Sequence, residues 1–164
     1  MDSIESLVNA VEGGASRIEL CSALSEGGLT PSIGFLKHAK SITSIPIHVL
    51  LRSRAGDFCY GENDIRIMSE DAKLLVEAGA DGIVLGCLDP EANIDVKNCQ
   101  TILESVKPRS NINFTFHRAF DLAQNPMKSA EVIKNLGFSR ILTSGQVIFY
   151  KIGTRYIFFM QNLF

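Results

Sequence analysis

The stretch FHRAFD (116–121) places an imidazole, a guanidinium and a carboxylate close together along the chain. His117 could act as a general acid, a general base or a metal ligand, because the ordinary pKa of histidine lies near neutrality. Asp121 could orient His117 or form an ion pair with Arg118. We therefore predict that His117 and Asp121 are catalytic residues. The alternative is that His117 is a hydrogen-bonded structural residue at the end of a strand.

A second stretch, RSRAGDFCY (52–60), places two guanidiniums before a glycine and a carboxylate. Two arginines in this arrangement suit a carboxylate or phosphate ligand, because a guanidinium binds such anions through parallel hydrogen bonds. The alternative is that the arginines only pair with nearby carboxylates such as Asp57. We predict a site for a small anionic ligand that includes Arg52, Arg54, Asp57, Arg118 and Ser144.

The stretch RIELC, which ends at Cys21, carries a carboxylate and a thiol among apolar residues. Glu19 would need a partner if it were buried, and Arg52 or Arg118 could supply one. Two interpretations of Glu19 stay open: a structural ion pair, or a catalytic partner of His117. Cys21 could bind a soft metal ion as a thiolate, but a free cysteine is also commonly a small core residue.

Alternating helices and strands must position these residues. Apolar residues recur at helical spacing in some segments and form short continuous runs in others. Ser3 or Asp2 and Thr30 are the predicted N-caps, with Pro31 in the first turn of its helix. Glycines 14, 79 and 137 each lie at the end of a predicted helix and precede a strand. Helices are expected over 3–12, 30–43, 61–80, 94–107 and 125–137, and strands over 16–21, 45–52, 81–88, 111–120 and 139–145.

This strict alternation predicts an α/β protein whose parallel sheet is covered by helices. An open doubly wound sheet and a closed barrel both fit the unit length, but no G-x-G-x-x-G follows the first strand. In a parallel barrel, side chains at the carboxyl ends of the strands line the functional site. The chemically reactive stretches lie at those ends. His48 lies early in its strand and is expected to be buried away from that site.

Composition and charge exclude several classes of protein. The chain has 164 residues, a net charge of −2 and scattered basic residues, so we expect one domain and no nucleic-acid partner. The N-terminus shows no secretory signal, and we expect no membrane span. The four cysteines follow no C-x-x-C pattern. These features favour free thiols and a cytoplasmic location.

Several stretches together are specific enough to name a family. The sequence resembles the CutC copper homeostasis family over residues 2–145, on the stretches IELCSALSEGGLTPS (18–32), RSRAGDFCY (52–60), EAGADGIVLGCL (77–88), FTFHRAFD (114–121) and LGFSRILTSG (136–145). The resemblance implies a TIM-barrel-like fold, a cytoplasmic location, a role in copper handling and Cu(I) binding through cysteine, here Cys21. It also implies that the family shares the positions Glu19, Cys21, Arg52, Asp57, His117, Arg118 and Asp121 around the barrel mouth.

Two departures from the family pattern bear on the copper prediction. The family begins with a strand of pattern E-V-C-V-D-S, and no counterpart of it precedes Asp2. Its cysteine would be the natural partner of Cys21 in a two-thiolate copper site. Ser53 replaces the proline of the family's R-P-R motif. We therefore expect a partial TIM barrel of about five βα units, without the first strand and the last two units.

The C-terminal segment differs from the rest of the chain. We divide the sequence into a partial barrel domain over 1–146 and an apolar tail over 147–164 that is outside the family pattern. Three functions stay open: copper homeostasis through Cys21, a TIM-barrel enzyme that acts on a small anionic substrate with His117 as acid or base, and a nonfunctional truncated isoform. A copper ion, a small anion and a second copy of the chain are the expected partners.

Overall fold

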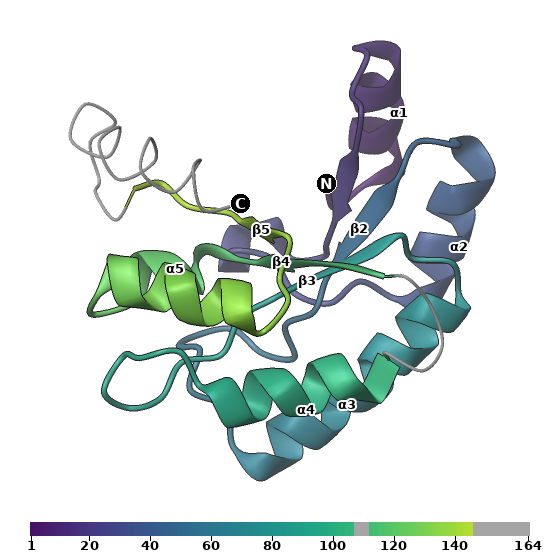
Figure 1. The fold of residues 1–164 in the computed structure, drawn as a ribbon. Coiled ribbons are helices and arrows are strands. Elements are labelled where there is room, and N and C mark those ends of the chain that lie inside the picture. Colours follow the sequence, from purple (N-terminus) through teal and green to yellow (C-terminus); the bar gives the residue numbers. More distant parts are fainter. Residues whose placement is uncertain (107–111, 146–164) are drawn as a thin grey trace.

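The structure, a computed structural model, describes residues 1–106 and 112–145 (Figure 1). Helices and strands alternate along the chain as predicted, and two short 3₁₀ helices, η1 and η3, lie in the loops after β1 and β4. The elements are α1 (Ile4–Glu12), β1 (Ile18–Leu20), η1 (Leu24–Glu26), α2 (Ile33–Ile42), β2 (Ile47–Leu50), α3 (Glu62–Glu77), β3 (Gly82–Leu85), α4 (Val96–Val106), β4 (Asn113–Phe116), η3 (Arg118–Leu122), α5 (Pro126–Asn135) and β5 (Arg140–Ile141).

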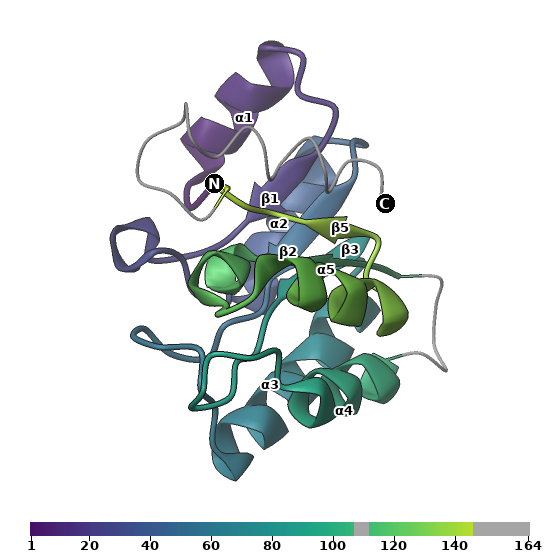
Figure 2. The ribbon, with the colours of Figure 1, turned by 60° about the vertical axis from the view of Figure 1, so that its left-hand side comes forward.

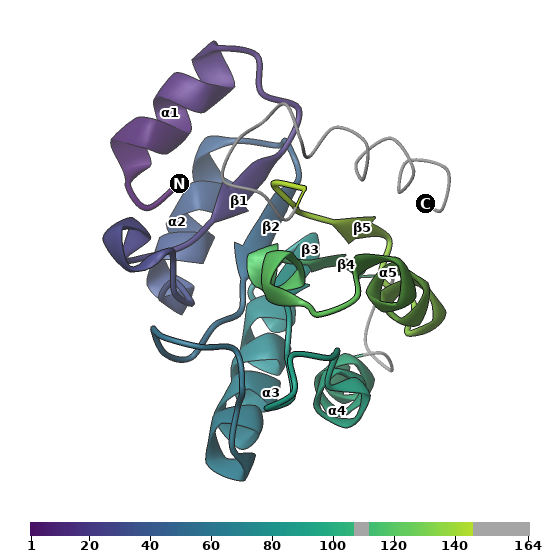
Figure 3. The ribbon, with the colours of Figure 1, turned by 90° about the vertical axis from the view of Figure 1, so that its left-hand side faces the viewer.

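The five strands form one parallel sheet in the order β1-β2-β3-β4-β5. Each strand pairs with the next one in the sequence, so the strand order never reverses. A doubly wound sheet requires such a reversal, whereas a β/α barrel adds its strands consecutively. Figure 3 shows the helices arranged around the strands, from α1 beside β1 to α5 beside β5, and Figure 2 shows the same arrangement from another side. The fold is a partial TIM-type barrel.

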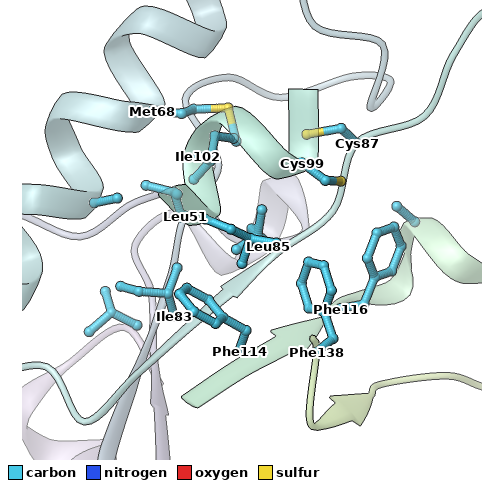
Figure 4. Packing of buried hydrophobic residues seen from close by; sticks show 14 of the residues in the cluster. Leu51, Met68, Ile83, Leu85, Cys87, Cys99, Ile102, Phe114, Phe116 and Phe138 are labelled. Atoms are coloured by element: carbon cyan, nitrogen blue, oxygen red, sulfur yellow. The ribbon is translucent and has the colours of Figure 1, made fainter. Parts of the chain in front are cut away.

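The sheet has two different faces because side chains alternate along each strand. On the outer face, residues such as Ile83, Leu85 and Phe116 are fully buried against the helices (Figure 4). On the inner face, a separate small cluster consists of Cys21, Leu50 and Val84. The polar side chains of the inner face lie on both sides of this cluster, toward the amino ends and toward the carboxyl ends of the strands. The sheet therefore separates a helix-packed core from a functional face.

Helix ends follow the predicted chemistry with one exception. The Ser3 and Asn125 side chains cap α1 and α5 by accepting hydrogen bonds from the amides of Ser6 and Lys128. The predictions for the start of α2 were wrong, because Ser32 and not Thr30 caps the helix, and Pro31 therefore precedes the cap instead of lying in the first turn. The Thr30 hydroxyl instead accepts from the Arg52 amide at 2.9 Å and donates to the Arg52 carbonyl at 3.1 Å.

The three glycines at the ends of predicted helices adopt the left-handed conformation that glycine tolerates. Their φ angles are +81° at Gly14, +98° at Gly79 and +93° at Gly137. The apolar tail predicted over 147–164 lies outside the described residues, as does the last residue of the helix predicted over 94–107. Within the described ranges, no helix has the length and hydrophobicity needed to span a membrane.

Candidate functional site

The strand register sets the height of each polar side chain on the inner face. Glu19, His48 and Gly82 form one row near the amino ends of the strands. His117 follows β4 and lies against Gly86, four residues further along the chain than Gly82. At about 3.3 Å per residue, these rows are about 13 Å apart. The register therefore does not bring Glu19 to His117, and the proposed catalytic pairing of the two has no geometric support.

Glu19 has a different environment from the one predicted. No described hydrogen bond or ion pair joins it to Arg52 or Arg118, and the residue is exposed on an edge strand. Partial burial of its carboxyl group raises its pKa, while the N-terminal ammonium and Arg17 oppose this shift. Glu19 thus belongs to the amino end of the inner face, away from the barrel mouth.

His117 is held as one tautomer by its own loop. Its Nδ1 accepts a hydrogen bond from the Ala119 amide at 3.2 Å, so the proton of a neutral ring resides on Nε2. The residue is only 4% exposed, and burial, together with the nearby charge of Arg52, lowers its pKa to about 3. Nε2 has no hydrogen-bond partner among the described residues. His117 therefore presents a neutral, unpartnered N–H donor.

Arg52 is a buried cation that contacts carbonyl oxygens. Its guanidinium donates to the carbonyls of Glu26 at 2.8 Å, Gly28 at 3.1 Å and Gly56 at 2.7 Å. The residue is 6% exposed, and no carboxylate pairs with it in the part of the chain that the structure describes. Its Nε is buried and has no hydrogen-bond partner within residues 1–106 and 112–145. The positive charge is thus fixed in place and not neutralised.

Two aromatic residues that the sequence reasoning missed complete this arrangement. The ring of Phe58 lies 4.8 Å from the His117 ring and 4.9 Å from the guanidinium carbon of Arg52. The Tyr60 hydroxyl is buried without a hydrogen-bond partner among the described residues, and burial raises its pKa although the Arg52 charge opposes this shift. Their position in the arginine stretch was the available signal, since both follow Arg52 within RSRAGDFCY. We call Arg52, Phe58, Tyr60 and His117 the mouth cluster.

Arg54 is engaged in structural contacts. It donates to Asp57 at 2.9 Å and to Asp64 at 3.2 Å, and also to the Cys59 carbonyl at 2.7 Å. Hydrogen bonds from Arg54, and one from the Cys59 amide, lower the pKa of Asp57. These contacts match the alternative that the arginine pairs with nearby carboxylates. Arg54 and Asp57 order the loop that carries Phe58 and Tyr60.

Asp121 connects the loop after β4 to the end of β5. It accepts hydrogen bonds from the Thr143 hydroxyl, from the amide and hydroxyl of Ser144, and from Arg118 at 3.0 Å. Arg118 also donates to the Ser144 hydroxyl at 3.2 Å. Burial alone would raise the pKa of Asp121, but these hydrogen bonds outweigh it, and the pKa is lowered. Of its two predicted roles, Asp121 fills the one that pairs it with Arg118.

Cys21 lies in the apolar middle of the inner face. It is buried with Leu50 and Val84, and burial raises the pKa of its thiol. All four cysteines are free. Cys87 and Cys99 lie next to each other in the outer core (Figure 4), where their mutual hydrogen bond and burial raise the pKa of Cys87. Within residues 1–106 and 112–145, no group of three His, Cys, Asp or Glu side chains is arranged to hold a metal ion.

A pocket of about 590 Å³ lies between α2, α3 and the loops after β1 and β2. Arg52 and Ser53 line it, and the Ser53 hydroxyl is buried without a described partner. Apolar side chains such as Ile67 and Leu75 form much of the remaining wall. The pocket therefore reaches the edge of the mouth cluster from the outer side of the sheet.

These features define the class of protein: an α/β protein with a partial TIM-type barrel and polar groups at the carboxyl ends of its strands. The sequence profile described as "CutC family" matches residues 1–157. The chain belongs to the CutC family. The matched range ends at residue 157 and so includes part of the predicted tail over 147–164. That tail lies outside the described residues.

Curated relatives support this assignment. The human "Copper homeostasis protein cutC homolog" is 48% identical over 145 residues, covering 88% of this chain and 52% of the human protein. A CutC family protein of Vibrio atlanticus is 47% identical over 148 residues, covering 90% of this chain and 60% of that protein. The chain thus spans somewhat more than half the length of these two relatives.

Solved structures agree on the fold. A CutC crystal structure from Streptococcus agalactiae has a TM-score of 0.91 and 31% identity, covering 99% of this chain and 79% of that chain. A phosphonomutase structure from Burkholderia cenocepacia has a TM-score of 0.61 at 15% identity, covering 87% of this chain and 66% of that chain. This more distant similarity concerns the fold alone.

Proposed function

We propose that the mouth cluster binds a small oxyanion, such as a carboxylate or phosphate group, and that the chain carries part of a TIM-barrel enzyme site. One observation carries the proposal: Arg52 Nε, His117 Nε2 and the Tyr60 hydroxyl are buried polar groups without described hydrogen-bond partners. Buried donors are expensive to leave unpaired, so a site that gathers them is typical of a ligand position. The unneutralised charge of Arg52 favours an anion there.

The protonation state and the tautomer of His117 determine how it can interact with a bound ligand. Because its pKa is lowered to about 3, His117 is a weak base and remains neutral at physiological pH. A neutral imidazole can donate its Nε2 proton in a hydrogen bond to a carbonyl or phosphoryl oxygen and so polarise it. We therefore propose that His117 stabilises developing negative charge on the ligand, and that it does so as a hydrogen-bond donor.

Arg118 supplies a second positive charge at the rim of the mouth. Its side chain is 64% exposed, and it contacts Asp121 and Ser144. An exposed cation beside a buried one favours the approach of an anionic substrate. We propose that Arg118 and Ser144 contact the part of the substrate that lies nearer to solvent.

Calorimetric titration with inorganic phosphate and with acetate tests the oxyanion proposal. We expect Tyr60→Phe, which removes only the hydroxyl, and His117→Gln to weaken binding of at least one of these probes about tenfold. Arg66→Gln is the matched control, because Arg66 is exposed on α3. Unchanged affinity in both mouth variants, with both variants folded, would exclude the mouth cluster as the ligand site.

Copper binding by Cys21 is the second candidate function. It is supported by the names of the curated relatives, which are copper homeostasis proteins, and by the preference of Cu(I) for thiolate ligands. The surroundings of Cys21 fit this role poorly, because Leu50 and Val84 pack on it and its Sγ accepts a hydrogen bond from the Met1 ammonium at 3.7 Å. We therefore propose that Cys21 contributes at most one ligand to Cu(I). In this role copper is the cargo of the protein.

Anaerobic Cu(I) titration against a chromogenic chelator tests this second candidate. If Cys21 is a ligand, Cys21→Ser lowers the Cu(I) affinity at least tenfold, while Cys59→Ser does not. Equal affinities in the wild type and in Cys21→Ser would rule out the role. The four free cysteines also support our proposal of a cytoplasmic location, since reducing compartments keep thiols free. Cell fractionation tests that location.

A further inference from the structure

A second pocket lies at the opposite end of the sheet from the mouth cluster. It has a volume of about 440 Å³ and opens where the strands begin. Every strand contributes to it or borders it, because its wall includes the residues just before and at the start of β1 to β5. The polar residues that line it are Ser16, Arg17, His48, Asp81, Asn113 and Arg140. None of these residues belongs to the mouth cluster.

We propose that this amino-end pocket is a separate binding site for a phosphate-bearing small molecule, with Arg17 and Arg140 as the charged ligands. The two arginines come from the first and last described strands of the sheet and both line the pocket. Neither has a carboxylate partner within 4.0 Å in the described ranges. Paired guanidiniums without counter-ions suit phosphate, because they bind its oxygens through parallel hydrogen bonds.

The acidic residues near the pocket do not neutralise the arginines. Asp81 lines the pocket, but its carboxylate accepts from Lys40 at 2.8 Å and from the Ile47 amide at 2.7 Å. Glu19 shares the row of His48 and lies near Arg17, and partial burial raises its pKa. Lys40 thus balances Asp81, and Arg17 and Arg140 outnumber the remaining carboxylate. The pocket keeps a positive charge.

His48 forms a rigid polar part of the wall. It is 4% exposed, and its ring packs on Gly82 so closely that a Cβ at this glycine would lie 2.6 Å from Nδ1. Burial and the charges of Arg17 and Arg140 lower its pKa to about 4, although Asp81 opposes this shift. A neutral imidazole between two guanidiniums adds hydrogen-bonding capacity without adding charge. Asn113 supplies further polar atoms to the same wall.

The volume of the pocket indicates the class of ligand. A pocket of about 440 Å³ falls in the usual range for small-molecule sites. Phosphate alone would fill only part of it, so we assign a phosphate monoester with a small organic group. The row that contains His48 is about 13 Å from the row that contains His117. The inference therefore does not depend on the function proposed for the mouth.

A titration with phosphate, monitored by NMR of the backbone amides and of the histidine side chains, tests this site. With inorganic phosphate at constant ionic strength, we expect shifts at His48, Gly82 and Arg140 in the wild-type chain. The double variant Arg17→Gln/Arg140→Gln should lose these shifts, with at least a tenfold weaker dissociation constant. His117→Gln should retain them, which distinguishes this site from the mouth cluster. Arg66→Gln is the control for the loss of surface charge.

Two results would overturn the inference. One is a wild-type chain whose His48 and Gly82 resonances do not respond to phosphate. The other is a folded double variant that keeps the wild-type dissociation constant at these resonances. If the double variant unfolds, Arg140→Lys is the alternative test, because lysine keeps the charge but lacks the planar guanidinium. We expect this variant to bind phosphate more weakly than the wild type. Unchanged phosphate binding would contradict the proposal.

Discussion

The imidazole of His117 lies directly over the α-carbon of Gly86, where an added Cβ would approach Nδ1 to 2.7 Å. The same relationship occurs at the other end of β3, where His48 lies over Gly82. Gly82 at the start of β3 and Gly86 just after its end thus accommodate two buried imidazoles, His48 from β2 and His117 from the position after β4. The absence of a side chain at each position lets the ring pack flat on the backbone. This packing fixes the polar groups at both ends of the inner face.

Gly86→Ala should displace the His117 ring. An added methyl group would overlap Nδ1 and Cε1, so the ring or the strand must move. We expect a loss of about 1–3 kcal/mol in the free energy of unfolding, as for other overpacked cores. Urea denaturation measures it. Gly34→Ala is the control: this glycine lies in α2, where an added Cβ would make only an ordinary contact with Ser32 Oγ at 3.9 Å, and alanine should be neutral or slightly stabilising. Equal effects of the two substitutions would contradict the packing described here.

The two buried histidines should make the fold sensitive to acid. In the folded chain the pKa is lowered to about 3 for His117 and to about 4 for His48. An unfolded histidine has a pKa of about 6.5, so between roughly pH 6.5 and pH 3 the unfolded chain binds more protons. The free energy of unfolding therefore falls as the pH falls through this window.

The His117 contribution to this slope can be isolated by substitution. Each histidine contributes at most about 1.4 kcal/mol per pH unit, which is the limit for one proton. We expect His117→Gln to give a shallower dependence of the unfolding free energy on pH between 6 and 4. Denaturation curves at several pH values measure both slopes. The same slope in the wild type and the variant would show that His117 titrates normally in the folded chain.

Asp121→Asn should loosen the connection between the β4 loop and the end of β5. The Asp121 carboxylate accepts hydrogen bonds from four groups, namely the Thr143 hydroxyl, the amide and hydroxyl of Ser144, and the Arg118 guanidinium. The substitution removes the negative charge of this acceptor. We expect a destabilisation of about 1–3 kcal/mol, the usual range for buried hydrogen bonds to a charged group. Glu131→Gln is the control, because this carboxylate is exposed on α5, and its expected effect is within about 0.5 kcal/mol. Comparable losses in both would refute the bridging role of Asp121.

The four thiols should differ in their rates of reaction with Ellman's reagent. Cys59 is half-buried, whereas Cys21, Cys87 and Cys99 are buried. Because access limits the reaction of buried thiols, we expect one fast-reacting thiol in the native chain and three that react only as the chain unfolds. Cys59→Ser should abolish the fast phase. A fast phase that survives in this variant would mean that another thiol is accessible.

Much of the fold could be predicted because its signals are local. The order of strands and helices follows from hydrophobic periodicity, and glycines 14, 79 and 137 mark the left-handed turns between them. The position of His117 at the end of β4 also follows from the sequence. Local signals fail where two elements compete for one side chain. Thr30 illustrates this, since its hydroxyl bonds to the backbone of Arg52 and leaves Ser32 to cap α2.

The composition of the site was harder to predict because it depends on register and on loop packing. Glu19 and His117 both precede polar loops, but only the register shows that their rows are about 13 Å apart. Arg52 and Arg54 look alike in sequence, yet Arg52 keeps an unpartnered Nε while Arg54 is engaged by Asp57 and Asp64. Tyr60 joins the site through the fold of its loop, and no pattern in the sequence specifies that fold.

The central claim is that His117 presents a neutral Nε2–H donor to an oxyanion at the mouth of the barrel. Nitrogen-15 NMR of the imidazole, recorded from pH 8 to pH 5 with and without inorganic phosphate or acetate, tests it most directly. We expect the Nε2–H tautomer throughout this range, and a change in the Nε2 shift when one of the anions binds, which Tyr60→Phe weakens. A ring that becomes protonated near pH 6.5, or an Nε2 shift that neither anion changes, would contradict the account.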